Sequence, residues 1–203
     1  MNIEKTEYES KIKILFDNWK KDKHLEYFVT DGIIDPEFYF RSKVKVLFIT
    51  KEANDCDDKG GYDLCKKILN PENYKTYVRH MIQWTWAFNE NFPDLNKFYE
   101  KVDEVKNKFI RSFAVLNLKK SGGGETSNNY NILEFAKRNK EFIKAELNII
   151  NPDIIIGLMS CPICGLEIIN PKTRYIKFYH PSYRRYTDQV FLNKLQDLYL
   201  NNI

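Results

Sequence analysis

Three clusters of polar side chains each follow directly after an apolar run that has the length of a β-strand. The clusters begin at Thr50, Asn117 and His180. In an open parallel α/β sheet, ligands bind at the carboxyl ends of the strands. The three clusters would therefore converge on one crevice, where carboxylate, amide, imidazole and cationic groups meet as a catalytic or ligand-binding site requires.

The first cluster brings two carboxylates close together in sequence, Glu52 and Asp55, beside Lys51 and Asn54. A carboxylate at a strand end can orient a water molecule or stabilise a developing positive charge. The alternative is ordinary loop polarity, in which Asp55 caps the start of a helix. Taken alone, this cluster favours the second interpretation.

The second cluster begins with an amide inside an apolar strand. Asn117 must find partners if it is buried, because an unsatisfied amide costs roughly 1–3 kcal/mol. Its donor and acceptor suit the edge of a nucleobase, and they suit neighbouring backbone groups equally well. Gly122, Gly123 and Gly124 follow. They leave backbone N–H groups open to close approach by a phosphate, although three glycines also describe a plain flexible loop.

The third cluster begins with His180, which precedes a proline. Proline disfavours helical backbone at the preceding residue, so the imidazole should point outward from the strand end. A neutral imidazole can donate a hydrogen bond to a developing oxyanion. Tyr183, Arg184 and Arg185 follow after Ser182 and are suited to contacting phosphates or filling a gap in a base stack. The alternative is that Arg184 and Arg185 are solvated surface charges before the last helix.

The bulk properties indicate a globular protein of 203 residues, 43% hydrophobic and 15% aromatic, which excludes a disordered chain. The formal net charge of +4 permits binding to a polyanion without requiring it. The polar N-terminus is unlike a signal peptide, and no apolar run approaches the roughly 20 residues of a membrane helix. We expect no membrane partner and a cytoplasmic location.

The four cysteines predict reduced thiols rather than disulfides in that compartment. Cys161 and Cys164 form one CxxC pair, which is a weak metal signal, and packing near a strand–helix junction explains them better. We therefore predict no metal site.

The positions of the clusters depend on the elements that carry them. Apolar runs predict strands, and helical periodicity predicts helices between them, which is typical of a parallel sheet covered on both faces. We predict one three-layer α/β/α domain over 1–203, with a helical N-terminal segment and a helical insert near 70–110. The expected strands are 44–50, 112–118, 154–158 and 174–179. The expected helices are 6–22, 62–69, 74–90, 95–109, 131–150, 162–169 and 187–201.

The order of these motifs resembles that of the uracil-DNA glycosylase superfamily, over about residues 44–200. Lys51-Glu52-Ala53-Asn54 is similar to a first motif that reads Gly-Glu-Ala-Pro-Gly in several branches. Asn117 stands where the family has a strand-ending asparagine that reads uracil. His180-Pro181-Ser182 matches the start of the second motif.

The segment 112–185 is most similar to the thermostable, iron–sulfur branch of that superfamily. The matching stretches are Asn117-Leu118-Lys119-Lys120, Asn151-Pro152-Asp153 and Tyr179-His180-Pro181-Ser182-Tyr183. The resemblance implies a four-stranded parallel sheet in the order 2-1-3-4, counted along the chain. The family's cluster-binding cysteines do not map onto the cysteines of this chain, so we predict no iron–sulfur cluster and no other cofactor.

The first motif departs from the family pattern. Lys51 and Asn54 replace its Gly and Pro, and Ala53 occupies the place of the catalytic Asp or Asn of other branches. Glu52, Asn54 and Asp55 remain as candidates for the missing polar group.

The resemblance implies a DNA glycosylase that cleaves the N-glycosidic bond of uracil or another modified base flipped from DNA. Glu52 or Asp55 would favour the sugar cation and hold the water, and His180 would donate to the base oxygen. Asn54 and Asn117 would read the base, on which Tyr62 would stack. The expected DNA contacts are Lys119, Lys120, Gly122, Gly123, Ser182, Tyr183, Arg184 and Arg185.

Two other functions remain open on the sequence. The altered first motif suits a catalytically silent domain on the same fold, which binds nucleic acid or nucleotides. An enzyme acting on free nucleosides is the third possibility. The expected partner under the first function is single- or double-stranded DNA, and we expect a monomer.

Overall fold

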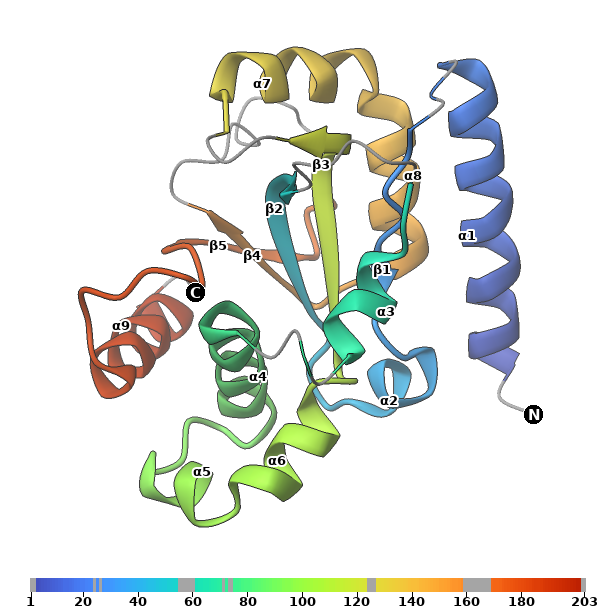
Figure 1. Ribbon diagram of the computed structural model, residues 1–203. Coiled ribbons are helices and arrows are strands. Elements are labelled where there is room, and N and C mark those ends of the chain that lie inside the picture. Colours follow the sequence, from blue (N-terminus) through green and yellow to red (C-terminus); the bar gives the residue numbers. More distant parts are fainter. Residues whose placement is uncertain are drawn as a thin grey trace.

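A β-sheet lies between two groups of helices in the computed structural model (Figure 1). Helices α1 (Ile3–Asp22) and α8 (Lys140–Ile150) pack on one face, and α4 (Thr76–Asn89) and α9 (Asp188–Asn201) pack on the other. The α/β class predicted from the sequence is confirmed. The structure describes residues 3–23, 25, 27–54, 61–70, 72, 75–123, 127–158 and 169–201, with only the backbone of Asn54.

The strands of the sheet are β1 (Gly32–Ile33), β2 (Val46–Asn54), β3 (Phe113–Gly123), β4 (Ile154–Leu158) and β5 (Arg174–Phe178). They lie in the order β1-β3-β2-β4-β5. β2 pairs in parallel with β3 and β4, and β4 pairs in parallel with β5, whereas β1 is antiparallel to β3. The prediction of a four-stranded, wholly parallel sheet is therefore wrong. The sheet is five-stranded and mixed, and its edge strand is too short to produce a periodic pattern in the sequence.

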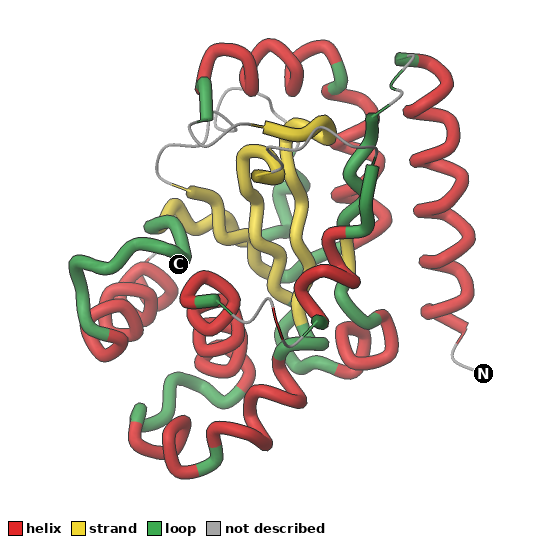
Figure 2. Tube along the Cα trace, in the orientation of Figure 1, coloured by secondary structure: helices red, strands yellow, loops and turns green. Residues whose placement is uncertain are grey.

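The remaining helices surround the sheet (Figure 2): α2 (Pro36–Arg41), α3 (Leu64–Leu69), α5 (Asn96–Glu100), α6 (Val102–Phe109) and α7 (Asn129–Arg138). Two long helices expected from the sequence are each interrupted, at Lys101 and at Asn139. At the second break the Asn139 amide accepts from Trp19 Nε1 at 2.7 Å and donates to the Phe135 carbonyl at 2.8 Å. In the described part of the chain, no helix is both long and apolar enough to cross a membrane.

Side chains of β3 alternate between the two faces of the sheet. Phe113 and Val115 enter the core that α4 and α9 cover, and Asn117 follows on that face. Ala114, Leu116 and Leu118 enter the other core, beneath α1 and α8. Lys120 continues this second series and is fully buried.

A buried cluster of three charged side chains holds β3 on the α1 side. The Lys120 ammonium pairs with Asp31 and lies 2.7 Å from Glu146 Oε2, and the side chains of all three residues are 0% exposed. Asp31 Oδ2 also accepts from the backbone N–H of Asn117 at 2.7 Å. Burial alone would lower the pKa of Lys120, but the charges of Asp31 and Glu146 raise it, so the ammonium stays protonated. Burial raises the pKa of Glu146 well above its usual range, against the effect of Lys120.

The glycine-rich stretch that follows Lys120 belongs to β3 as far as Gly123 and is not a loop there. Ala53 pairs with Gly122 and Asn54 with Gly123, after a register shift that follows Glu52. A Cβ built on Gly123 would lie 2.2 Å from Cδ of Glu52, so a larger residue at this position would require the Glu52 side chain to move. The backbone of Gly122 and Gly123 is therefore engaged in the sheet, in contrast to the open phosphate-binding loop expected from the sequence.

Replacing Lys120 by Met should destabilise the fold by about 3–5 kcal/mol, because the buried carboxyl groups of Asp31 and Glu146 lose the cation between them. Met retains the length of the side chain, so the loss reports mainly on the charge. The measurement is the free energy of unfolding in urea at pH 7. Lys137→Met is the matched control, since Lys137 pairs with Glu134 in solvent with 54% of its side chain exposed. It should change stability by less than about 1 kcal/mol, and equal losses in the two variants would refute a structural role for the cluster.

Candidate functional site

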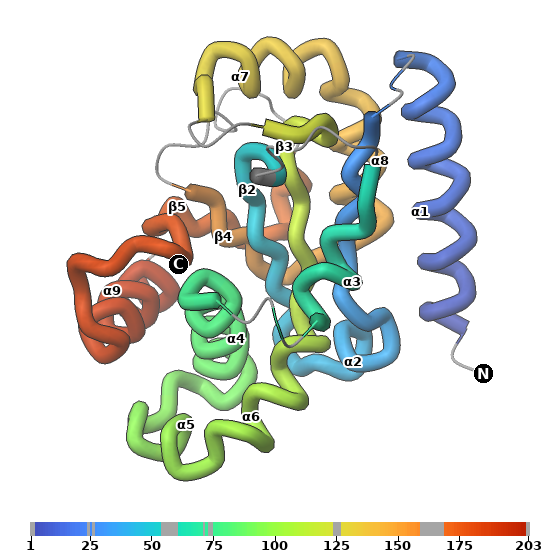
Figure 3. Tube along the Cα trace, in the orientation of Figure 1, coloured from blue at the N-terminus to red at the C-terminus, as the bar shows by residue number. Residues whose placement is uncertain are grey.

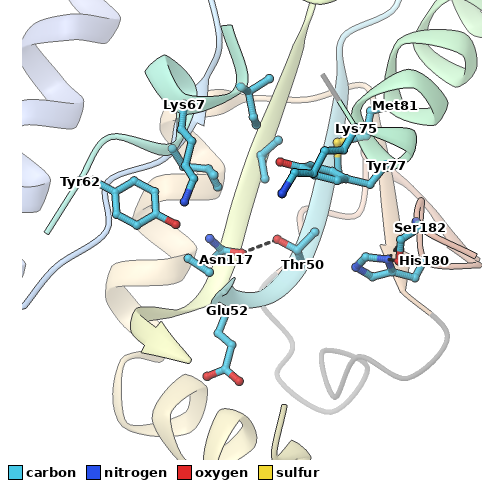
Figure 4. A pocket seen from close by; sticks show the side chains of 14 residues that line it. Thr50, Glu52, Tyr62, Lys67, Lys75, Tyr77, Met81, Asn117, His180 and Ser182 are labelled. Carbon is cyan, nitrogen blue, oxygen red and sulfur yellow. Dashed lines mark hydrogen bonds between the residues drawn. The ribbon is translucent and has the colours of Figure 1, made fainter. Parts of the chain in front are cut away.

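A pocket of about 370 Å³ opens at the carboxyl ends of β2 and β3 (Figure 4). This volume lies within the range of small-molecule sites. Segments far apart in the sequence form its wall (Figure 3): β2, α3 and the residues before it, the start of α4, β3, and the turn after β5. Five of the residues singled out from the sequence line this one pocket: Glu52, Tyr62, Asn117, His180 and Ser182.

Asn117 is the most constrained polar group of the pocket. Its side-chain oxygen accepts from the Thr50 hydroxyl at 2.5 Å, and its backbone N–H donates to Asp31. Among the described residues, no acceptor contacts the Asn117 Nδ2 atom, although the residue is only 2% exposed. A buried amide donor without an acceptor costs free energy, which an acceptor on a bound ligand would recover.

Glu52 faces a cation from the neighbouring strand. Its Oε2 lies 2.6 Å from Lys119 Nζ, and the side chains are 6% and 20% exposed. The same ammonium donates to the Gly122 carbonyl at 2.9 Å. Figure 4 shows the Glu52 carboxylate directed away from Asn117 and Thr50. In this conformation Lys119 balances the charge of Glu52, which reduces the effect of that charge on a ligand lying over Asn117.

His180 lies at the rim of the pocket, on the side opposite Tyr62 (Figure 4). Its Nδ1 accepts from the backbone N–H of Ser182 at 3.0 Å and lies 2.6 Å from the Ser182 hydroxyl. Because Nδ1 accepts, the proton of a neutral ring is on Nε2. The atoms packed around the ring lower the pKa of His180, and the positive charge of Lys51 lowers it further. At neutral pH the imidazole is therefore a neutral Nε2–H donor.

A network behind His180 fixes the turn that carries it. The Pro181 carbonyl accepts from His80 Nδ1 at 2.5 Å, and His80 Nε2 lies 3.3 Å from Asp188. Asp188 also accepts from Arg79, from Gln83 at 3.1 Å and from Tyr99 at 2.5 Å. Burial would raise the pKa of Asp188, but the hydrogen bonds from His80, Arg79, Tyr99 and Gln83 hold that pKa well below its usual range.

The wall formed by α3 and α4 contains residues that the sequence did not indicate as functional. Lys67 Nζ lies 4.4 Å from the centre of the Tyr62 ring, and Lys75 and Tyr77 line the pocket beside them. Tyr77 is partly buried against the core and also lines the pocket. Its position at the first turn of α4 was the available signal, because the ends of helices reach the surface.

The expected DNA-binding residues have separate environments. Arg184 and Arg185 are exposed, and Ser182 holds the His180 ring. Tyr183 stacks on Tyr179, with ring centres 5.0 Å apart, so it packs against the protein in this conformation. Lys120 cannot contact DNA, because it is buried on the other face of the sheet and paired with carboxylates, which corrects that expectation.

Several predicted residues lie outside the described part of the chain. They are Asp55, Gly124, Cys56, Cys161, Cys164, most of the expected helix 162–169 and the side chain of Asn54. Cys65, which is described, contacts the Gly32 carbonyl at 3.7 Å, and burial raises its pKa, so the thiol stays protonated. Within the described ranges, no three His, Cys, Asp or Glu side chains gather as they would around a metal ion.

Comparison with protein-family models, with curated proteins and with solved structures finds no match to this chain.

Replacing Asp188 by Asn should weaken the fold by about 1.5–3 kcal/mol at pH 7, because hydrogen bonds to a charged acceptor are lost. The pKa of Asp188 is lower in the folded state than its unfolded value of about 3.9. Its contribution is therefore complete above about pH 5 and is lost as the pH falls through the folded-state pKa. Urea unfolding at pH 3, 5 and 7 should show the difference between wild type and variant shrinking towards low pH. Asp197→Asn, at an exposed position of α9, is the control and should show no such trend.

Proposed function

We propose that the pocket binds a nucleobase and that the chain is a DNA glycosylase acting on uracil or another modified base flipped from DNA. The observation that carries this proposal is the buried Asn117 amide, whose Nδ2 donor has no acceptor among the described residues. A base oxygen or ring nitrogen is such an acceptor. Tyr62 and Tyr77 supply aromatic rings along the same pocket, where a planar base can pack.

The bond to be broken joins the base to the sugar. In the proposed reaction the sugar becomes oxocarbenium-like while its bonding electrons move onto the base. His180 suits the second part, since its neutral Nε2–H can donate to the base oxygen on which that charge develops. Water then adds to the sugar carbon and gives up one proton, which the departed base anion takes up, so the products are the neutral free base and an abasic sugar.

The second candidate is a catalytically silent domain that binds nucleic acid or nucleotides. One observation favours it: the Glu52 carboxylate pairs with Lys119 and is directed away from Asn117. A carboxylate so compensated gives less stabilisation to a sugar cation. The two candidates share the base-binding pocket and differ in whether bound base is released.

Under the first candidate, purified protein should release base from DNA that carries uracil, hypoxanthine or a bulky modified pyrimidine, in single or double strands. His180→Leu should lower the single-turnover rate by about 10²–10³-fold, because the donor to the leaving base is lost. Asn117→Leu should mainly weaken binding, because the amide that contacts the base is removed. The measurement is product release resolved by chromatography, with each variant's unfolding midpoint as a control for folding. Binding without release from any substrate would favour the silent domain.

DNA binding should depend on salt, and Arg184 and Arg185 should contribute to that dependence. Each phosphate contact adds about 0.9 to the slope of log affinity against log salt for duplex DNA, and about 0.7 for a single strand. Replacing both arginines by Ala should weaken binding and flatten this slope, measured by fluorescence anisotropy between 50 and 200 mM salt. Lys21→Ala with Lys144→Ala removes two exposed charges from α1 and α8, beyond the opposite face of the sheet. If both double variants give the wild-type slope, the 183–185 loop is not part of the DNA surface.

A further inference from the structure

The amino end of α4 opens onto the same pocket without a side-chain cap. Lys75 is the residue that precedes the helix, and its side chain makes no capping hydrogen bond. Within the described ranges, no group accepts from the backbone N–H of Thr76 or Tyr77, whereas that of Val78 bonds to the Lys75 carbonyl at 3.0 Å. The first turn of a helix with free N–H groups carries a partial positive charge and favours an anion.

Two ammonium groups lie along this part of the pocket. Lys67 and Lys75 both line it, and Figure 4 shows both side chains reaching from α3 and α4 towards Asn117 and Thr50. The Tyr62 ring lies 4.4 Å from Lys67 Nζ and so limits the positions of that side chain. Glu52 is the one carboxylate among the described lining residues, and Lys119 balances its charge. The pocket therefore has an excess of positive charge on its α3–α4 side.

An independent observation in the same pocket indicates a ligand. The Nδ2 donor of Asn117 is buried and lacks an acceptor within the described part of the chain. The neutral Asn117 donor lies at the bottom of the pocket, and the ammonium groups of Lys67 and Lys75 lie on its wall. Together they are complementary to a molecule that has a polar planar part and an anionic part. A nucleoside phosphate has both, and a pocket of about 370 Å³ is large enough to enclose most of one.

We propose that Lys67, Lys75 and the first turn of α4 form a phosphate subsite, which binds the phosphate of the nucleotide whose base contacts Asn117. The base part of this inference rests on the proposed function, and the phosphate part stands on the two lysines and the helix end. The phosphate is either that of a free nucleotide or the phosphodiester next to a flipped base. The chemistry of recognition is the same for both, because lysine binds phosphate oxygens as a point charge.

Calorimetric titration of the whole chain with deoxyuridine and with deoxyuridine 5′-monophosphate tests the subsite. The monophosphate should bind about tenfold more tightly, as expected for charge-assisted hydrogen bonds at a partly exposed site. Lys67→Gln combined with Lys75→Gln should abolish that advantage, so that the variant binds the nucleoside and the monophosphate with equal affinity. Lys66→Gln is the matched control on α3, since Lys66 is outside the pocket with 84% of its side chain exposed, and it should retain the advantage.

A second titration with inorganic phosphate, followed by ³¹P line broadening, separates this inference from the proposed function. If wild type binds phosphate, the double variant does not, and no base is bound or released, the subsite stands and the glycosylase proposal fails. A uracil-containing single strand identifies the source: if it alone depends on the two lysines, the phosphate is that of the DNA backbone. Equal affinity for nucleoside and monophosphate, together with no binding of phosphate or oligonucleotide, would overturn the subsite. So would an effect of Lys66→Gln as large as that of the double variant.

Discussion

The buried ammonium of Lys120 is the constraint on which the rest of the structure depends. A charged group with 0% exposure is tolerated only where opposite charges surround it, and Asp31 and Glu146 provide them from the segment before β1 and from α8. Asp31 also accepts the backbone N–H of Asn117, so the cluster holds β3 at the residue that forms the pocket floor. The aromatic rings of Phe16 and Trp19, 5.5 Å from the ammonium, link the same cluster to α1.

The polar groups of this protein fall into two kinds that differ in how completely they are paired. Asp188 accepts from Arg79, Gln83 and Tyr99 and lies 3.3 Å from His80 Nε2, and this network determines the position of the turn at His180 from behind. Asn117, by contrast, is held by Thr50 and Asp31 while its Nδ2 donor keeps no acceptor among the described residues. Groups of the first kind give a rigid frame. The Asn117 donor, held in direction by Thr50 and Asp31, is preorganised for a ligand.

The sequence by itself determined the α/β class and the main strands, because buried parallel strands produce continuous apolar runs that need no tertiary information to be seen. It also indicated that polar residues after separate strands would meet, since the carboxyl ends of parallel strands share one edge of a sheet. Glu52, Asn117 and His180 indeed line one pocket. The two-residue β1 and the helix break at Asn139 left no such pattern, because each depends on one or two contacts with distant segments.

Only the tertiary structure decided which of two adjacent lysines is buried. Lys119 and Lys120 differ by one position, and in a strand one position changes the face of the sheet. Continuous apolar runs do not reveal which face carries the pocket, so Lys120 could not be assigned to the core from sequence. Glu52 pairs with Lys119, which is 67 positions away in the sequence. Lys67 and Lys75 reach the pocket only because α3 and α4 pack beside β3. Such pairings depend on the relative placement of elements, which local residue patterns do not specify.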